Sequence, residues 1–469
     1  MAFILCAFSF GVVLEPLGTW GGFGALLLVP LAGNTALRLM ASIEILRRPG
    51  MHRKRKLPRM PPHRMPAYTV LVPMFDEPHG VPALVQSLAA LDYPRDRLEL
   101  VLVLEERDAV TRAAVAMLRM PSNLRVVLVP TGGPKTKPKA LNYALASVTS
   151  ELVVVFDAED RPEPEQLRIA AHAFATGGWD LACVQARLNV YNPDDSFWSR
   201  QFALEYSALF DGLLPALDRL RMPIPLGGTS NHFCVSILRS VGAWDPYNVT
   251  EDADLGIRLA RAGYRTATIA STTWEEAPVD AKVWLGQRTR WLKGWMQTWL
   301  VHMRHPIRLL REAGVWQCLG ILVTLGGVLL AVLVYPIALG ALALAWFLGG
   351  FDDVDPTGSR SWLWVVALTN LGAGIIAPML AAVLAVLRRG RPRLLSSVIW
   401  MPAYWIVISI AGYRALVEFM QRPFYWEKTR HGLGGLRKRM LPPPPRPGRT
   451  DGPRPSPRAA GHAQRVRRP

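Results

Sequence analysis

The chain has 469 residues, of which 50% are hydrophobic, and a formal net charge of +18. This length suits one catalytic domain plus a membrane region, because a single water-soluble domain would not need so many apolar runs. The basic residues gather beside apolar segments and in the C-terminal tail, as in cytoplasmic loops of membrane proteins, so we expect no nucleic acid partner. The 4 cysteines form no CxxC pair, and neither a zinc site nor a disulfide framework is expected.

Residues 1–48 are predicted to be an N-terminal transmembrane region. The apolar run at 26–46 approaches the length of a membrane span, whereas residues 1–14 are a shorter run. The first residues contain no Lys or Arg, which argues against a cleaved signal peptide. The linker at 49–66 is strongly basic, and this charge predicts that the domain after it is cytoplasmic.

Between residues 67 and 280, short apolar strands alternate with helical patterns. Strands are predicted at 68–74, 98–104, 124–129, 152–156 and 181–191, and helices at 81–91 and 197–217. This alternation indicates a parallel α/β sheet, in which ligands bind at the carboxyl ends of the strands. Acidic residues follow several of these strands, so the sequence predicts the functional site at this edge.

The fourth predicted strand is followed by the sequence FDAED, whose acids are candidate metal ligands. Asp157 and either Glu159 or Asp160 offer hard oxygen ligands, which suit Mg²⁺ or Mn²⁺. A turn with surface acids is the alternative. The apolar strand before these acids and the lysines in the preceding loop favour the metal site.

A basic loop separates the third and fourth predicted strands. Lys135, Lys137 and Lys139 precede a helix that begins near Ala140. Cations at a helix N-terminus are unfavourable unless an anion offsets them. The loop is therefore predicted to bind an anion, with a solvated surface loop as the alternative.

Residues 250–252 read TED and stand at the start of a predicted helix. A carboxylate in this position faces the positive end of the helix dipole and stays ionised, as a general base must. Asp252, with Glu251 beside it, is the candidate base. A capping box is the alternative.

A second motif, QxxRW, follows in the next predicted helix. Gln287, Arg290 and Trp291 share one helical face at this spacing. An amide, a guanidinium and an indole together suit a diphosphate leaving group and a stacked sugar ring.

TED followed by QxxRW, next to apolar segments, resembles the processive family 2 glycosyltransferases, the group that contains cellulose, chitin and hyaluronan synthases. The resemblance runs from about residue 68 to residue 431. It implies an α/β GT-A domain, the nucleotide-diphospho-sugar transferase fold, inserted between N-terminal and C-terminal transmembrane helices. It also implies a UDP-sugar donor and a cytoplasmic catalytic domain in the plasma membrane.

The resemblance assigns further roles by position. Donor binding is expected of Phe75, Glu77, Glu105, Lys139 with Asn142, Asp157 and Arg290. Acceptor binding is expected of Gln287, Trp291, Gly228 and Thr229, the last two in the loop LGGTSNHF. The metal on Asp157 and Glu159 or Asp160 would hold the donor diphosphate, and Asp252 with Glu251 would carry out catalysis.

Residues 281–314 are predicted to be interfacial helices, and residues 315–420 a C-terminal transmembrane region. Apolar runs lie at 316–349, 362–387 and 394–420. The first run fits one long kinked span or two short ones, so the sequence leaves the number of spans open.

Residues 421–440 resemble a gating segment, with an interfacial aromatic belt as the alternative. Closure over the donor would use Phe424, Trp426, Lys428, Thr429 and Arg430. Residues 441–469 are rich in Pro, Arg and Gly, and are predicted to form a disordered basic tail near anionic lipid.

The sequence thus predicts an inverting transferase that polymerises a UDP-hexose, with UDP-glucose the first candidate, into a β-linked polysaccharide. The product would cross the membrane through the enzyme's own helices, with accessory export subunits as expected partners. One alternative is a single-addition transferase that acts on a lipid-linked acceptor. An alternative from another class is a transporter or receptor with a degenerate nucleotide domain.

Overall fold

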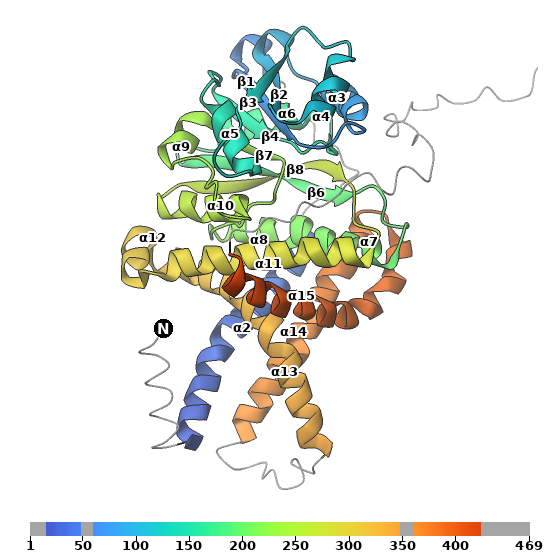
Figure 1. Ribbon diagram of the computed structural model, residues 1–469. Helices are drawn as coiled ribbons and strands as arrows, with labels where there is room; N and C mark the ends of the chain where they lie inside the picture. Colours follow the sequence, from blue (N-terminus) through green and yellow to red (C-terminus); the bar gives the residue numbers. More distant parts are fainter. Residues whose placement is uncertain (1–15, 48–59, 348–360, 424–469) are drawn as a thin grey trace, which may run out of the picture. The chain divides into compact units, whose positions relative to one another are not determined.

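The computed structural model describes residues 16–47, 60–347 and 361–423 (Figure 1). The predicted disordered tail and nearly all of the predicted gating segment lie outside these ranges. Outside them, too, lie the five predicted gating residues, Phe424, Trp426, Lys428, Thr429 and Arg430.

Within the described residues, an eight-stranded mixed sheet forms the centre of the α/β domain, in the order β3-β2-β1-β4-β7-β6-β8-β5. Its strands are β1 (Tyr68–Met74), β2 (Leu98–Glu105), β3 (Leu124–Val129), β4 (Leu152–Val155), β5 (Arg161–Pro162), β6 (Leu181–Val190), β7 (Asn231–Cys234) and β8 (Arg265–Glu275). The strands β3, β2, β1 and β4 pair in parallel, and β6 is parallel to β8.

The sequence predicts a parallel sheet, but the sheet is mixed, because β7 is antiparallel to both β4 and β6. Asn231 at the start of β7 pairs with Val155 at the end of β4. The loop that carries Gly228 and Thr229 therefore enters the sheet at the functional edge, and β7 must run away from that edge. This reversal brings the loop next to the DAED turn.

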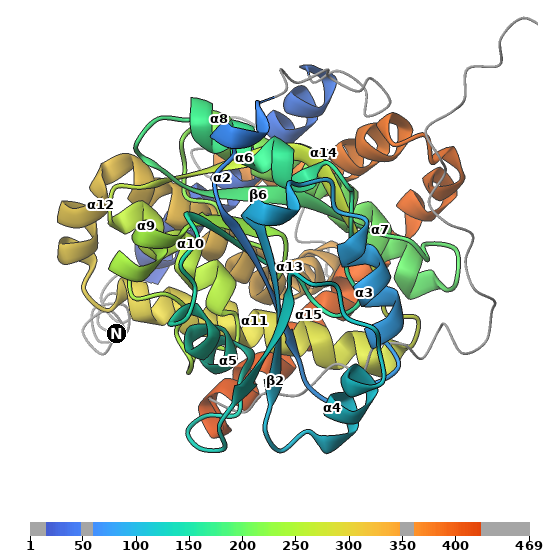
Figure 2. The same cartoon turned by 90° about the horizontal axis from the view of Figure 1, so that it is seen from above.

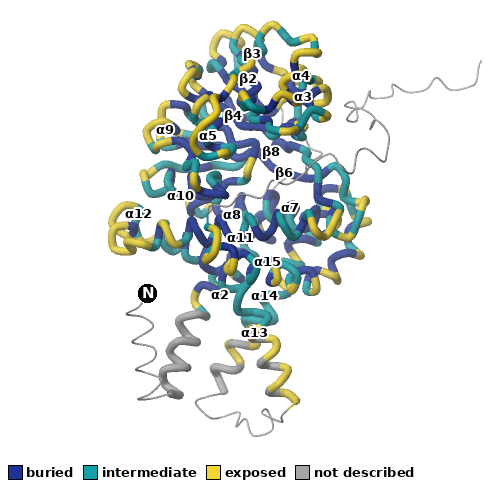
Figure 3. Tube along the Cα trace, viewed as in Figure 1, coloured by how far each residue is buried: buried dark blue, intermediate teal, exposed yellow. Residues whose placement is uncertain are grey.

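Helices cover both faces of the strands that form the nucleotide half of the sheet. They are α3 (Val81–Ala89), α4 (Ala109–Ala116), α5 (Lys137–Leu145) and α6 (Gln166–Thr176). Along β1, Val70 and Val72 pack with α3 and α4 residues, whereas Leu71 packs with α5 residues on the other face. Figure 2 shows α4 and α5 on opposite sides of β2. Strands covered on both faces read as continuous apolar runs, and Figure 3 shows them buried.

The other half of the sheet rests on helices that lead toward the apolar segments. They are α7 (Phe197–Ala208), the π-helix η3 (Leu209–Leu213), α8 (Leu214–Arg219), α9 (Val235–Ser240), α10 (Glu251–Arg261) and α11 (Ala281–Met303). The apolar region comprises α2 (Pro16–Arg47), α12 (Pro306–Ile321), the π-helix η4 (Leu322–Gly326), α13 (Gly327–Phe347), α14 (Ser361–Arg388), the 3₁₀ segment η5 (Pro392–Trp400) and α15 (Met401–Gln421).

Three helical segments in the described ranges are long and apolar enough to cross a membrane: Pro306–Ile337, Leu368–Arg388 and Pro392–Gln421. The predicted N-terminal span falls in α2, which is not one of these three but packs against α13 and α14. In Figure 1, α2, α13 and α14 extend away from the sheet.

The helix α15 lies along α11, as Figure 1 shows. Two polar pairs join these helices. The Trp284 indole donates to the Tyr404 hydroxyl at 2.9 Å, and the buried Lys293 ammonium lies 3.4 Å from a Glu418 carboxylate oxygen. Pairs of this kind are specific in direction, so α15 is held to α11 by more than its apolar surface.

Candidate active site

One continuous cavity of about 1370 Å³ joins the carboxyl ends of the strands to the apolar helices. It brings together nearly all of the residues that the sequence singled out. These are Phe75, Glu77, Glu105, Asp157, Glu159, Gly228, Thr229, Glu251, Asp252, Gln287, Arg290 and Trp291. Beyond them the cavity continues between α2, α13, α14 and α15. Of the predicted site residues in the described ranges, Lys139, Asn142 and Asp160 do not line it.

The TED motif opens α10. Thr250 is the N-cap residue but makes no side-chain capping hydrogen bond, and Ala253 at the third helical position cannot complete a capping box. One oxygen of Asp252 accepts from the backbone N–H of Ala253 at 2.8 Å. A Cβ added to Gly228 would lie 3.4 Å from the other oxygen, so this loop passes directly over the Asp252 carboxylate.

The two carboxyl groups of the motif perturb each other. Burial, and then the neighbouring Asp252 charge, raise the pKa of Glu251 to about 7. Burial also raises the pKa of Asp252, against the hydrogen bond from Ala253 and the positive charge of Lys137. Glu251 therefore titrates near neutral pH, directly beside the candidate base Asp252.

Lys137 lines the cavity, whereas Lys139 does not. The Lys137 ammonium donates to Asp157 and to the carbonyl of Gly228, the latter at 2.8 Å. Burial lowers the pKa of Lys137, but the Asp157 and Glu251 charges more than offset this and raise it above its ordinary value. Lys139, expected to contact the nucleotide, instead donates to the carbonyl of Pro130 at 2.9 Å.

Helix geometry explains this difference, because α5 begins at Lys137 and residues two apart on a helix differ by about 200° in direction. Lys137 and Lys139 therefore point to opposite sides. Asn142, expected to act with Lys139, bonds through its side chain to the backbone of Trp244 at 2.7 and 3.1 Å. It fixes the fold rather than contacting the cavity.

The DAED turn separates the two acids that follow Asp157, namely Glu159 and Asp160. Asp160 is 1% exposed, and one of its oxygens accepts from the Asp157 backbone N–H at 2.7 Å and from the Thr229 hydroxyl. These bonds fix the turn and leave Glu159, which lines the cavity, as the candidate metal ligand beside Asp157. No group of three His, Cys, Asp or Glu in the described ranges is placed to hold a metal. Two carboxylates fit a divalent ion only if the donor phosphates complete its ligands.

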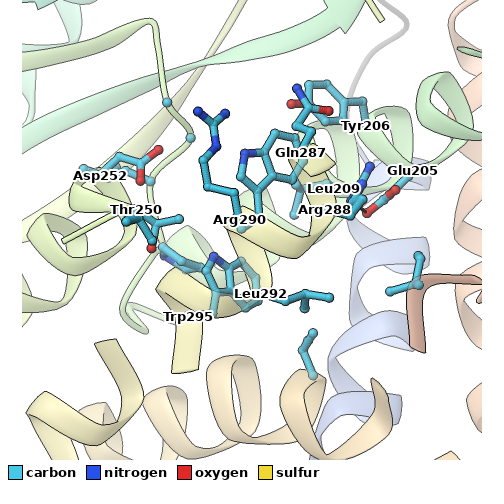
Figure 4. A pocket seen from close by; sticks show the side chains of 18 of the residues that line it. Glu205, Tyr206, Leu209, Thr250, Asp252, Gln287, Arg288, Arg290, Leu292 and Trp295 are labelled. Atoms are coloured by element: carbon cyan, nitrogen blue, oxygen red, sulfur yellow. Dashed lines mark hydrogen bonds and ion pairs between the residues drawn. The ribbon is translucent and has the colours of Figure 1, made fainter. Parts of the chain in front are cut away.

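The QxxRW residues lie on α11 and line the same cavity as the TED motif. Figure 4 shows the Arg290 guanidinium and the Asp252 carboxylate directed into the same space. The Gln287 side-chain oxygen is buried and accepts no hydrogen bond from any described residue. A buried acceptor of this kind calls for a ligand hydroxyl or water.

Trp291 is held in place by aromatic and cationic neighbours. Its ring stacks on Tyr206 at 6.5 Å between centroids and 24° between planes, and the Arg288 guanidinium lies 4.7 Å from its centre. Arg288 in turn donates to Glu205 at 2.6 Å, and Tyr404 donates to the same carboxylate at 3.1 Å. This chain of contacts fixes the indole against the cavity wall.

A close contact between α11 and the TED motif went unnoticed in the sequence. A Cβ added to Gly294 would lie only 2.3 Å from the Thr250 hydroxyl oxygen. Glycine therefore lets α11 approach α10 closely enough for Arg290 and Asp252 to share one space. Because the need for glycine at position 294 comes from Thr250 in a distant segment, no local pattern of residues around Gly294 indicates it.

Glu275 is a second residue that the sequence reading missed. It ends β8 at the same edge as Asp157 and lines the cavity. Burial, and then the charges of Glu159 and Asp157, raise its pKa well above the usual range. Its position at a strand's carboxyl end was the available signal.

Residues 66–294 match the family described as "Glycosyltransferase like family 2". The chain carries a glycosyltransferase family 2 domain. The curated relatives of this domain include a beta-monoglucosyldiacylglycerol synthase of Synechocystis sp., 29% identical over 246 residues, or 51% of this chain and 50% of that protein. They also include the catalytic subunit of cellulose synthase 1 of Komagataeibacter xylinus, 23% identical over 252 residues, or 51% of this chain and 32% of that protein.

A solved structure shares the fold of the glycosyltransferase domain and its surroundings. It is the mannosyltransferase PcManGT of Pyrobaculum calidifontis in complex with GDP-Man and Mn²⁺, with a TM-score of 0.53 and 20% identity. The match covers 85% of this chain and 98% of that one. The chain spans about half the length of the first curated relatives that it matches.

Proposed function

We propose that the chain is an inverting glycosyltransferase that moves a hexose from a UDP-sugar to a hydroxyl group of a membrane lipid. This proposal rests on the observation that the cavity is continuous. It runs from the charged strand ends past Asp252 and into a space lined mainly by aliphatic side chains, among them Leu31, Val332, Leu371, Ile375 and Ile406. A lipid can place its acyl chains among these side chains and its head group beside Asp252, the proposed general base.

Asp252 takes the proton of the acceptor hydroxyl as its oxygen attacks the anomeric carbon. The new C–O bond forms on the face opposite the diphosphate, so an α-linked donor gives a β-linkage. The bond from the anomeric carbon to the diphosphate oxygen breaks, and its electron pair leaves on the nucleoside diphosphate. Arg290 and Lys137 lie where that charge develops, and such preorganised charge is commonly a large part of catalysis.

A divalent ion, Mg²⁺ or Mn²⁺, is part of the proposal. Asp157 and Glu159 would hold it together with oxygens of the donor diphosphate, and it would offset charge on the leaving group. Removing divalent ions with EDTA should abolish turnover, and Glu159→Ala should weaken metal-dependent donor binding more than Asp160→Ala. EDTA-insensitive turnover would exclude the metal.

The remaining acceptor contacts come from α11 and from the loop that carries Gly228 and Thr229. Trp291 offers a ring face to the acceptor head group, and the buried oxygen of Gln287 can accept one of its hydroxyls. Gly228 leaves room for the head group above Asp252. Phe75, Glu77 and Glu105 line the opposite end of the cavity, where the nucleoside would lie.

Synthesis and export of a β-linked polysaccharide is the second candidate. The TED and QxxRW motifs favour it, as does the likeness to a cellulose synthase catalytic subunit. A sugar chain, however, needs hydrogen-bond partners along its path, because burying polar groups without them costs several kcal/mol. The mainly aliphatic lining beyond Trp291 therefore supports the lipid acceptor. Translocation, export partners and donor gating by residues 421–440 belong to the second candidate.

The test uses the purified full chain in vesicles with a panel of UDP-sugars and GDP-mannose. Nucleoside diphosphate release is measured together with the product, by lipid extraction and by digestion with linkage-specific glycosidases. A labelled product in the organic phase supports the proposal. A long glycosidase-sensitive polymer in the aqueous phase would establish the polysaccharide synthase instead, and no release with any donor would exclude a transferase.

A further inference from the structure

The helix-lined end of the cavity is mainly aliphatic, and Arg38 is the charged side chain that α2 contributes to it. Arg38 lines it from α2, and its Nε donates to Asn34 at 3.4 Å. Among the residues that the structure describes, no carboxylate forms an ion pair with Arg38. Nearby helix contacts fix this part of α2: Thr35 donates to Asn370 of α14 at 3.2 Å, and a Cβ added to Gly212 would lie 2.8 Å from Ile45.

The carboxylate whose charge reaches Arg38 is already engaged. Glu205 interacts electrostatically with Arg38, but its two oxygens accept from Arg288 at 2.6 Å and from Tyr404 at 3.1 Å. Two guanidinium groups thus share one carboxylate in a low-dielectric space. An excess positive charge in such a space is costly unless an anion accompanies it.

The proposed general base, Asp252, limits which anionic ligand can react in this cavity. A phosphate monoester is already a nucleophile at neutral pH and needs no general base, whereas an alcohol does. Asp252 lines the same cavity beside Glu251, and the proposed function makes Asp252 the general base. The acceptor that satisfies both ends carries an anionic phosphate at Arg38 and a free hydroxyl at Asp252.

We infer that the acceptor is a phospholipid with a hydroxyl-bearing head group, bound through its phosphodiester at Arg38 and through its chains between α2, α13 and α14. This inference rests on the lipid acceptor proposed above. The nucleophile is the head-group alcohol. Its proton goes to Asp252, its oxygen bonds to the anomeric carbon of the sugar, and the nucleoside diphosphate departs. The phosphodiester takes no part in bond making.

Binding and transfer are tested separately, with the full chain in maltoside micelles. Native mass spectrometry measures occupancy by phosphatidylglycerol, phosphatidic acid or diacylglycerol without a donor. Phosphatidylglycerol and phosphatidic acid should bind, and Arg38→Gln should weaken both by about tenfold, as expected for a lost charge-assisted hydrogen bond. Arg38→Lys should retain part of the affinity. Arg47→Gln is the matched control, since Arg47 is exposed at the end of the same helix and does not line the cavity.

Transfer then identifies the reacting group. With a donor present, phosphatidylglycerol should take the sugar and phosphatidic acid should not, because only the former has a head-group hydroxyl. Equal use of diacylglycerol, unchanged by Arg38→Gln, would overturn the inference while leaving a lipid transferase. Sugar on phosphatidic acid would overturn the alcohol nucleophile. If no lipid takes sugar, the proposed function itself fails. Unchanged melting temperature and nucleotide binding in Arg38→Gln establish that the variant is folded.

Discussion

The donor end and the acceptor end of the cavity are built in different ways. The donor end consists of charged side chains at strand ends and in short loops, such as Asp157, Glu105 and Lys137. The proposed acceptor end consists mainly of aliphatic side chains from four helices far apart in the sequence, together with Arg38 of α2. Local motifs therefore reveal the donor chemistry, whereas the acceptor class depends on how the helices assemble. The predictions below test the junction of these ends first and then the donor end.

The largest effect is expected at the junction, where Asp252 faces the acceptor. Asp252→Asn preserves shape but removes the basic lone pair, so turnover should fall about 100-fold to 10,000-fold while nucleotide affinity stays unchanged. Nucleoside diphosphate release and calorimetric binding measure the two quantities. Asp92→Asn, in a surface ion pair, is the control. Turnover within a few fold of wild type would remove Asp252 as the base.

The contact between Gly294 and Thr250 ties the two motifs together. Gly294→Ala should push α11 away from α10 and separate Arg290 from Asp252, with a fall in turnover on the order of 100-fold and a loss of about 1–3 kcal/mol in stability. Gly340→Ala, where an added Cβ meets nothing within 4 Å, is the matched control. Turnover is measured well below the melting temperature of each variant. Equal turnover in the two variants would contradict the importance of this close approach.

Two lysines two residues apart offer a sharper test of the donor end. Lys137→Met should weaken donor binding about tenfold, because it removes a charge-assisted contact in the cavity. Lys139→Met should leave donor affinity nearly unchanged, since its ammonium donates to loop carbonyls. Titration with a fluorescent nucleotide measures both. The reverse order of effects would restore the assignment made from the sequence.

The smallest effect concerns pH. Glu251, whose pKa is raised to about 7, gains a proton as the pH falls, and burial favours protonation of Asp252 as well, so kcat/KM should decline toward acid pH. Glu251→Gln removes the neighbouring charge and should move this acid limb of the pH profile to lower pH.

The raised folded-state pKa of Glu251 also affects stability: the contribution of Glu251 to stability is full below its unfolded pKa and is lost as the pH rises through 7. Thermal unfolding across pH 5 to 8 in wild type and Glu251→Gln measures that part.

Much of the nucleotide half could be predicted from the sequence. The strands β1, β2, β3 and β4 lie within one residue of their expected bounds. The strands β1 and β4 read as apolar runs because they are buried between helices, whereas the edge strand β3 is only partly buried. The helical phase of QxxRW and the position of TED at a helix start were equally local. The antiparallel β7 was not foreseen, since its direction follows from the loop before it and from its neighbours β4 and β6.

The sequence by itself determined which residue types gather at the strand ends and on one face of α11, since strand direction and the helical period fix side-chain placement locally. Tertiary structure decided which lysine enters the cavity, which acid of DAED is buried, and how closely Gly294 approaches Thr250. It also decided that α15 lies along α11 and that the cavity continues between apolar helices around Arg38. Each of these depends on contacts between segments far apart in the chain, and no local pattern of residues encodes such contacts.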